Sequence, residues 1–171
     1  MVAPVKFAHV VLKTSRYQEM IAWWTRLLDA HVRHGGDFIS FISYDDEHHR
    51  LAIANFPNLQ LVSPDASGVE HFAFTFATLD DLFAKYEQLR DVGVVPYWTI
   101  NHGMTLSAYY RDPDGNQVEL QVDAMDYAAA DRFMNSPVFA SNPIGIDVDF
   151  PALIARRRAG ERPEAITAYS S

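Results

Sequence analysis

The strongest constraint on the fold is a repeated pattern of secondary structure along the 171 residues. Each half of the chain is expected to contain a strand, a helix and three further strands. A repeat of this size predicts two related modules rather than one irregular fold. The expected class is α+β, with two tandem βαβββ modules whose curved mixed sheets form a cleft between them.

Alternating and helical hydrophobic spacing predicts the elements of the first module. A capping box at Thr14-Ser15 with Gln18 is expected to begin its helix. The expected strands cover residues 5–12, 30–33, 38–43 and 49–54.

The second module shows the same order of signals. Thr78 is a candidate N-cap with Asp81 three residues later, and Gly93 is a candidate helix terminator. The expected strands cover residues 69–76, 94–100, 105–110 and 117–122.

These signals also predict the organisation of the chain. The first module is expected at 1–57 and the second at 69–123, with a linker at 58–68 that contains Pro64 and Asp65. The tail at 124–171 is too apolar to be unpacked, and short helices are expected at 125–134 and 151–159. We expect it to cover the cleft or an oligomer contact.

Composition excludes several functional classes. The formal charge is −8 and the pI is near 5.2, which argues against a nucleic-acid partner. The absence of cysteine excludes disulfides, thiolate metal sites and cysteine nucleophiles. We expect no secretory signal, and no apolar run of about 20 residues predicts a membrane-spanning helix. A cytoplasmic protein without a membrane partner is expected, and it is expected to self-associate.

Three polar residues interrupt apolar strands and need an explanation. Glu119 lies in Gln-Val-Glu-Leu-Gln-Val, His9 in Phe-Ala-His-Val-Val and His71 at the start of His-Phe-Ala-Phe-Thr-Phe. A buried charge is costly unless it is paired or bound to a metal. Two imidazoles and one carboxylate form the ligand set of non-haem iron(II) sites with open positions.

Strand alternation places the three residues consistently. Phe72, Phe74 and Phe76 would pack against a helix, so His71 would face the cleft, and the same parity applies to His9 and Glu119. His9 and His71 match in the repeat, whereas the counterpart of Glu119 falls near Leu51. We therefore expect three protein ligands rather than four.

Simpler explanations exist for each residue alone. A single histidine in an apolar strand is more often a hydrogen-bonded core residue than a ligand, and Glu119 could pair with Arg50 or Arg111. The matched positions in the repeat favour a metal site over these alternatives.

Several segments resemble the vicinal oxygen chelate superfamily, which includes glyoxalases, bleomycin-resistance proteins and extradiol dioxygenases. The segments are Ala8-His9-Val10, His48-His49-Arg50-Leu51-Ala52, Glu70-His71-Phe72-Ala73-Phe74, Asn101-His102-Gly103, and Tyr109 to Asn116 leading to Glu119. Within the superfamily the chain resembles single-domain type I extradiol dioxygenases. The Asn142 to Gly145 segment is also similar to single-domain members.

The resemblance implies roles for six residues. His9, His71 and Glu119 would bind Fe(II), with Mn(II) as an alternative. His49 would be the acid/base histidine, and Tyr109 and His102 would contact the substrate.

The expected strand parity bears on these roles. It places His49 on the cleft side with Leu51 and turns His48 away. The alternative for the His48-His49 pair is a solvated turn, and His102 could be a simple turn residue. Trp98, Phe41 and Phe38 are candidates for the wall of an aromatic pocket.

The implied function is Fe(II)-dependent extradiol cleavage of a catechol-type diol with O2. One alternative is a glyoxalase-like, metal-dependent isomerase or lyase, although the Leu51 position argues against a fourth ligand. Others are a non-catalytic protein that binds aromatic drugs, and a metal-bearing homologue without catalytic activity.

Overall fold

The computed structural model of the protein describes residues 1–60, 63 and 66–169. The chain divides into two compact units. The first contains Met1–Gly68 with Asp112–Asn116, and the second contains Val69–Arg111 with Gln117–Ser171. Pro64 and Asp65 of the predicted linker lie outside the described residues.

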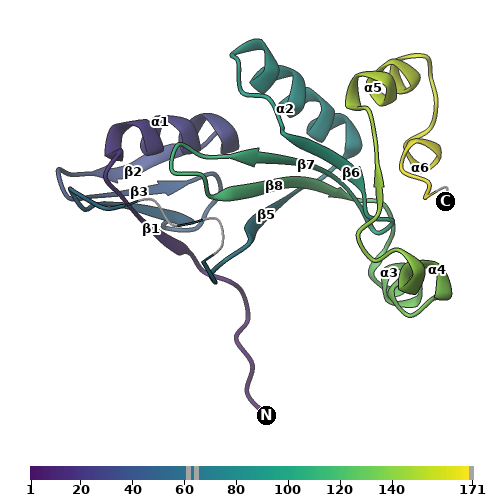
Figure 1. Ribbon diagram of the computed structural model, residues 1–171, viewed down its shortest axis with the longest axis horizontal. Coiled ribbons are helices and arrows are strands. Elements are labelled where there is room, and N and C mark those ends of the chain that lie inside the picture. The colour runs from purple at the N-terminus through teal and green to yellow at the C-terminus, as the bar shows by residue number, and fades with distance from the viewer. Residues whose placement is uncertain (61–62, 64–65, 170–171) are drawn as a thin grey trace. The chain divides into compact units, whose positions relative to one another are not determined.

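The first unit contains one helix and a four-stranded mixed sheet (Figure 1). The strand order is β1-β4-β3-β2, and the outer strand β1 runs parallel to β4. The elements follow the predicted order: β1 Val10–Thr14, α1 Tyr17–Leu28, β2 His31–Gly35, β3 Ile39–Ser43 and β4 Leu51–Asn55.

Helix α1 packs through an apolar stripe. Tyr17, Met20, Trp24 and Leu27 are buried, and the Tyr17 hydroxyl lies 2.7 Å from Ser40 Oγ on β3. The predicted cap at Thr14-Ser15 is wrong by one or two positions. Arg16 is the N-cap residue and has no capping side-chain bond, because the Thr14 hydroxyl instead accepts the Arg16 N–H.

The second unit repeats the order and adds the tail. Its sheet runs β5-β8-β7-β6-β9, with β5 parallel to β8. Its elements are β5 His71–Phe76, α2 Leu79–Asp91, β6 Trp98–Asn101, β7 Thr105–Arg111 and β8 Gln117–Asp123, followed by α3 Tyr127–Met134, α4 Pro137–Ser141, β9 Ile146–Asp147, α5 Phe150–Arg158 and α6 Pro163–Ile166.

The predicted limits of α2 are confirmed. The Thr78 hydroxyl accepts the Asp81 N–H, and Gly93 follows the helix with a φ of 79°. This left-handed conformation is the one that glycine adopts at the end of a helix.

Other predicted boundaries differ from the structure. The first strand begins at Val10, so His9 precedes it, and β4 begins at Leu51, so His49 lies in a loop. Strand β6 is four residues shorter at its start than predicted. Helices α4 and α6 and strand β9 were not predicted.

The turn between β7 and β8 belongs to the first unit. Asp112 Oδ2 accepts a 3.2 Å hydrogen bond from the buried indole N–H of Trp24, and the Pro113 carbonyl accepts from Arg16. Within the turn, Asp112 also accepts from the Asp114 and Asn116 backbone N–H groups. The Asp-Pro-Asp-Gly-Asn sequence is thus a docking turn for α1 as well as a hairpin connection.

The tail docks on its own unit. Strand β9 pairs with β6, and Phe150 of α5 is 1% exposed with its ring 5.4 Å from those of Phe83 and Tyr86 on α2. Figure 1 shows α5 beside α2. None of the helices formed by the described residues has the length and apolar character needed to cross a membrane.

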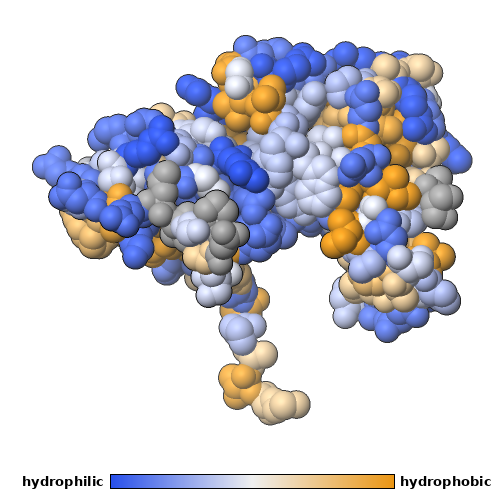
Figure 2. Space-filling model, in the orientation of Figure 1, coloured by the Kyte–Doolittle hydropathy of each residue, from blue (hydrophilic) through white to orange (hydrophobic). Residues whose placement is uncertain are grey.

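Exposed apolar side chains occur in the two units. Figure 2 shows them along the extended N-terminal segment, where Val2 and Val5 are almost fully exposed. In the tail, Val138 and Ile144 are also exposed.

Replacing Phe150 tests the docking of the tail. Phe150→Ala is expected to lower the free energy of unfolding by about 3–5 kcal/mol, because a fully buried ring leaves a cavity. Urea unfolding followed by circular dichroism measures the change. The control Val138→Ala removes an exposed side chain and should stay within about 0.5 kcal/mol. Equal stability of the two variants would contradict the docking.

Candidate functional site

Glu119 is the buried polar centre of the second unit. It lies in the middle of β8 and is only 4% exposed. The strands on either side supply its neighbours: Ala73 of β5 and Tyr109 of β7 are directly opposite Glu119. Residues two apart on a strand share a face, so His71, two positions before Ala73, lies diagonally across from the carboxylate.

Two imidazoles approach the carboxylate. His71 Nε2 lies 3.2 Å from Glu119 Oε2, and His102 Nε2 lies 3.8 Å from Oε1. The structure thus brings together two of the predicted ligands, His71 and Glu119, and places the predicted catalytic His102 beside them. His102 follows β6 directly and so reaches the same face of the sheet.

Neither candidate arginine pairs with the buried Glu119 carboxylate. The Arg111 guanidinium lies 4.5 Å from the ring centre of Tyr97, and Arg50 binds Asp45 through Nε and Nη2. Among the described residues, only histidines make ion pairs with Glu119. The explanation in which Glu119 pairs with Arg50 or Arg111 is therefore not the arrangement observed.

Tyr109 adds a hydroxyl to this group. Its OH lies 3.0 Å from His102 Nε2, and its ring lies 5.3 Å from that of His71 and 4.9 Å from that of Trp98. Burial first and the Glu119 carboxylate second raise the pKa of Tyr109 far above its ordinary value. The group is therefore a neutral hydrogen-bonding hydroxyl over the whole physiological pH range.

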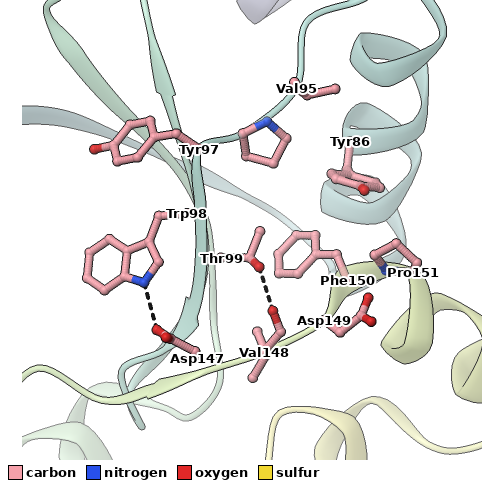
Figure 3. Close-up of a pocket in the computed structure, with 11 residues that line it drawn as sticks. Tyr86, Val95, Tyr97, Trp98, Thr99, Asp147, Val148, Asp149, Phe150 and Pro151 are labelled. Carbon is pink, nitrogen blue, oxygen red and sulfur yellow. Dashed lines mark hydrogen bonds between the residues drawn. The ribbon is translucent and has the colours of Figure 1, made fainter.

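Trp98 connects this face to the tail. Its indole N–H donates a 2.7 Å hydrogen bond to Asp147 Oδ1 of β9, as Figure 3 shows. A cavity of about 440 Å3 is lined by this pair and by Tyr86 and Phe150. The cavity lining does not include His71, His102, Tyr109 or Glu119.

The first unit contains the remaining predicted residues. The His9 and His49 rings are 4.3 Å apart, and the Phe41 ring lies 4.8 Å from that of His49. The structure therefore brings the predicted ligand His9 and the predicted acid/base residue His49 together. Phe41 is paired with Ala52, so these rings lie on the sheet face opposite α1.

The predicted orientation of His48 is wrong. His48 Nδ1 lies 2.6 Å from His49 Nδ1, and His48 Nε2 lies 3.3 Å from Glu47 Oε1. Residues 44–48 are bends and His49 precedes β4, so strand alternation does not apply to His48 and His49. Partial burial and then the neighbouring His9 and His48 lower the pKa of His49.

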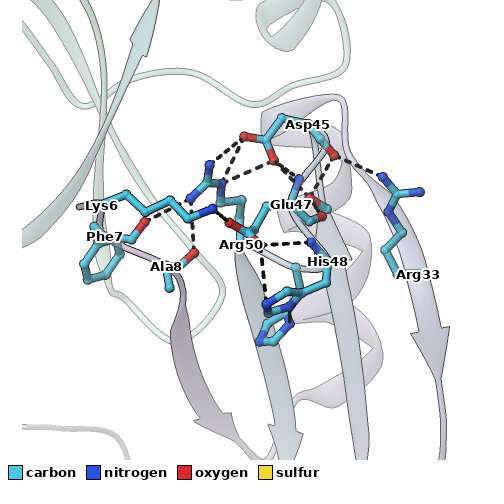
Figure 4. Close-up of polar contacts among 10 residues, drawn as sticks. Lys6, Phe7, Ala8, Arg33, Asp45, Glu47, His48 and Arg50 are labelled. Carbon is cyan, nitrogen blue, oxygen red and sulfur yellow. Dashed lines mark hydrogen bonds and ion pairs between the residues drawn. The ribbon is translucent and has the colours of Figure 1, made fainter. Parts of the chain in front are cut away.

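Loop contacts hold this histidine pair. Arg50 binds the Asp45 carboxylate and the carbonyls of Phe7 and Ala8, and Lys6 binds Glu47 (Figure 4). These contacts join the segment before β1 to the loop before β4. Charged side chains therefore help to position both loops, together with the backbone bonds of Arg50 to Val10 and Ile42.

The position matched to Leu51 also needs correction. Because His9 matches His71 in the repeat, Val11 of β1 matches Ala73 of β5. Ala73 pairs with Glu119, and Val11 pairs with Ala52, so the counterpart of Glu119 is Ala52. Leu51 pairs with Ile42, which shares a sheet face with Ser40. Ser40 contacts Tyr17 of α1, so Leu51 lies on the face that α1 covers. Like leucine, alanine cannot bind a metal through its side chain. The expectation that the first half has no carboxylate matching Glu119 is therefore unchanged.

Within each unit taken separately, the described residues do not assemble three His, Cys, Asp or Glu side chains around one point. The second unit supplies His71 and Glu119, and the first supplies His9. Donor chemistry nevertheless fits a metal in the second unit, because a buried carboxylate and an imidazole nitrogen converge there, with no lysine or arginine of the described residues paired to the carboxylate.

Comparison with known proteins identifies the family. Residues 6–120 match the Glyoxalase/Bleomycin resistance protein/Dioxygenase superfamily. The chain belongs to this superfamily. Its resemblance to the vicinal oxygen chelate proteins is thereby confirmed, as is the predicted α+β class.

Curated relatives are similar over almost the whole chain. Biphenyl-2,3-diol 1,2-dioxygenase 2 of Rhodococcus globerulus is 45% identical over 173 residues, covering 99% of this chain and 90% of the relative. Biphenyl-2,3-diol 1,2-dioxygenase 3 of the same organism is 39% identical, covering 95% and 87%.

A solved structure supports the fold alone. The structure of a glyoxalase/dioxygenase from Nostoc punctiforme superposes with a TM-score of 0.60 and 15% sequence identity. The match covers 72% of the present chain and 96% of the Nostoc chain.

The raised pKa of Tyr109 can be tested directly. The difference between the spectrophotometric titrations of wild type and Tyr109→Phe isolates the Tyr109 phenol. We expect its pKa to lie above the ordinary tyrosine value of about 10. Since folding raises this pKa, its contribution to stability is full below about pH 10 and is lost as pH rises through the folded value. A phenolate that forms at or below pH 10 would contradict the assigned surroundings of the hydroxyl.

Proposed function

We propose that this chain is an Fe(II)-dependent extradiol dioxygenase that cleaves a catechol-type diol with O2. The observation that carries the proposal is buried Glu119 flanked by His71, His102 and Tyr109 in a superfamily member. The names of the two Rhodococcus relatives support an aromatic diol as the substrate.

The proposed metal ligands are His9, His71 and Glu119, with Mn(II) as the alternative ion. A bound Fe(II) would supply charge stabilisation and a common binding point for the diol and O2. Self-association and a cytoplasmic location stay predictions from the sequence.

His49 is the proposed acid/base group. A lowered pKa keeps its imidazole neutral near pH 7, so it can accept a proton from the diol. A catechol and O2 together have the composition of the ring-opened 2-hydroxymuconic semialdehyde product. Every proton removed from the diol must therefore be returned, and the same imidazole can do both.

His102 and Tyr109 are proposed to orient the substrate oxygens. The Tyr109 hydroxyl stays neutral, so it can donate a hydrogen bond to a diolate oxygen without adding negative charge. The adjacent Trp98 ring offers an apolar surface beside this hydroxyl for the aromatic ring of the diol.

Anaerobic purification, iron quantification and an oxygen-electrode screen over a catechol panel test the function. We expect about one iron per chain and oxygen uptake equal to the diol consumed, with a yellow ring-opened product. Stoichiometric metal with isomerase or lyase activity and no oxygen uptake would instead favour the glyoxalase-like alternative.

The metal ligands can be tested without activity. His71→Ala and Glu119→Gln are expected to lose stoichiometric iron, because each removes one donor of the pair observed in the second unit. The control His31→Ala removes an exposed histidine of β2 and should keep its iron. Full iron content in His71→Ala would remove His71 from the ligand set.

Replacement of His49 should separate catalysis from metal binding. His49→Ala and His49→Gln are expected to retain iron, while kcat falls about 10²–10⁴-fold, as for loss of a general acid–base group. Iron analysis beside steady-state oxygen uptake measures both effects. Unchanged turnover would exclude His49 from the mechanism.

A further inference from the structure

A backbone carbonyl of the tail holds the His102 ring. His102 Nδ1 makes a hydrogen bond with the carbonyl oxygen of Ile144. A carbonyl oxygen can only accept, so the hydrogen of this bond must be on Nδ1. The ring is only partly exposed, and its tautomer is therefore determined by a contact from a distant part of the sequence.

The tautomer decides how His102 meets Tyr109. A neutral imidazole with hydrogen on Nδ1 has an acceptor at Nε2. Nε2 lies 3.0 Å from the Tyr109 hydroxyl and can accept its hydrogen whenever that hydrogen is not directed to the Glu119 carboxylate, the other acceptor beside the hydroxyl. Glu119 Oε1 is 3.8 Å from Nε2 and beyond ordinary hydrogen-bond distance, so it does not require a hydrogen there.

The loop that supplies the carbonyl is held by its own hydrogen bonds. The Asn142 side chain accepts the Gly145 N–H at 3.0 Å and donates to the Gly145 carbonyl at 2.7 Å. These two bonds close the loop around Pro143 and Ile144. The Ile144 side chain is 60% exposed, so the residue contributes its backbone rather than a buried side chain.

Gly145 permits the close approach of this loop to β6. Its φ is 118°, and a Cβ there would lie 2.3 Å from the Asn101 carbonyl oxygen and 2.9 Å from His102 Cα. A larger residue would push the loop away from His102. Beyond the loop, Ile146 and Asp147 pair with Asn101 and Ile100, so the tail is anchored independently of the imidazole.

We propose that the Asn142–Gly145 loop is a positioning element that fixes the orientation and the Nδ1–H tautomer of His102. The proposal deepens the proposed function and rests on it for its catalytic consequence. Its structural part stands on the loop geometry alone. Ile144 acts through its carbonyl, and Asn142 and Gly145 act by holding that carbonyl in place.

Asn142→Ala is the main test, because it opens the loop without adding atoms. The matched control is Asn135→Ala, since Asn135 also bonds a tail carbonyl, that of Asp131, at 2.8 Å. Gly145→Ala is a second variant. Thermal unfolding checks that each protein is folded.

Long-range proton–nitrogen NMR of the metal-free proteins reads the tautomer, at pH about 9 where an ordinary imidazole is neutral. His102→Gln assigns the resonances. We expect the Nδ1–H tautomer in wild type and Asn135→Ala, and a mixture of tautomers in Asn142→Ala and Gly145→Ala. An Nε2–H tautomer in wild type, or no change in folded Asn142→Ala, would overturn the proposal.

Steady-state kinetics tests the catalytic consequence. With iron content unchanged, Asn142→Ala should lower kcat about 2–10-fold, the effect of one misplaced hydrogen bond, while Asn135→Ala keeps wild-type turnover. An unchanged kcat despite a mixed tautomer overturns the catalytic part. Absence of dioxygenase activity in wild type overturns the proposed function, whereas the NMR result still decides the structural part.

Discussion

The burial of the Glu119 carboxylate is the interaction on which the arrangement of the second unit depends. A carboxylate in a central strand must be compensated locally, because its desolvation costs far more than a hydrogen bond returns. The parallel strand β5 supplies His71 diagonally, and the antiparallel strand β7 supplies Tyr109 directly opposite. The mixed sheet is therefore the means by which residues from three sequence segments meet one charge. His102 completes the group from the end of β6.

The two units hold their polar residues in different ways. In the second unit, Glu119 and Tyr109 lie on paired strands, so their positions follow from hydrogen-bonded register. In the first unit, His9 and His49 lie just outside β1 and β4, and Asp45 and Arg50 position the loop. Side chains on rigid strands are well suited to hold a metal, whereas a loop histidine can move a proton with small changes in position. His71, Glu119 and His49 follow this division, whereas His9, the third proposed ligand, precedes its strand.

The tail changes how the repeat should be understood. Each module provides a four-stranded sheet and a helix, and the tail adds β9 and α5 to the second unit only. Phe150 packs against α2, while the Ile144 carbonyl reaches His102. The tail therefore links the stability of the second unit to the orientation of a side chain in the candidate site. The repeat provides two similar scaffolds, and the added tail makes the second unit differ from the first.

The sequence by itself determined the repeated βαβββ order, the cap at Thr78 and the facing of His71 and Glu119, because hydrophobic period and capping chemistry are local. It did not determine the loop geometry of His48 and His49, since strand alternation was applied to residues that lie outside the strands. It also misplaced the counterpart of Glu119 at Leu51, because only inter-strand register identifies Ala52. The contact from Ile144 to His102 was decided by tertiary structure alone. A backbone carbonyl has no side-chain signature, and its direction depends on how the tail packs against β6.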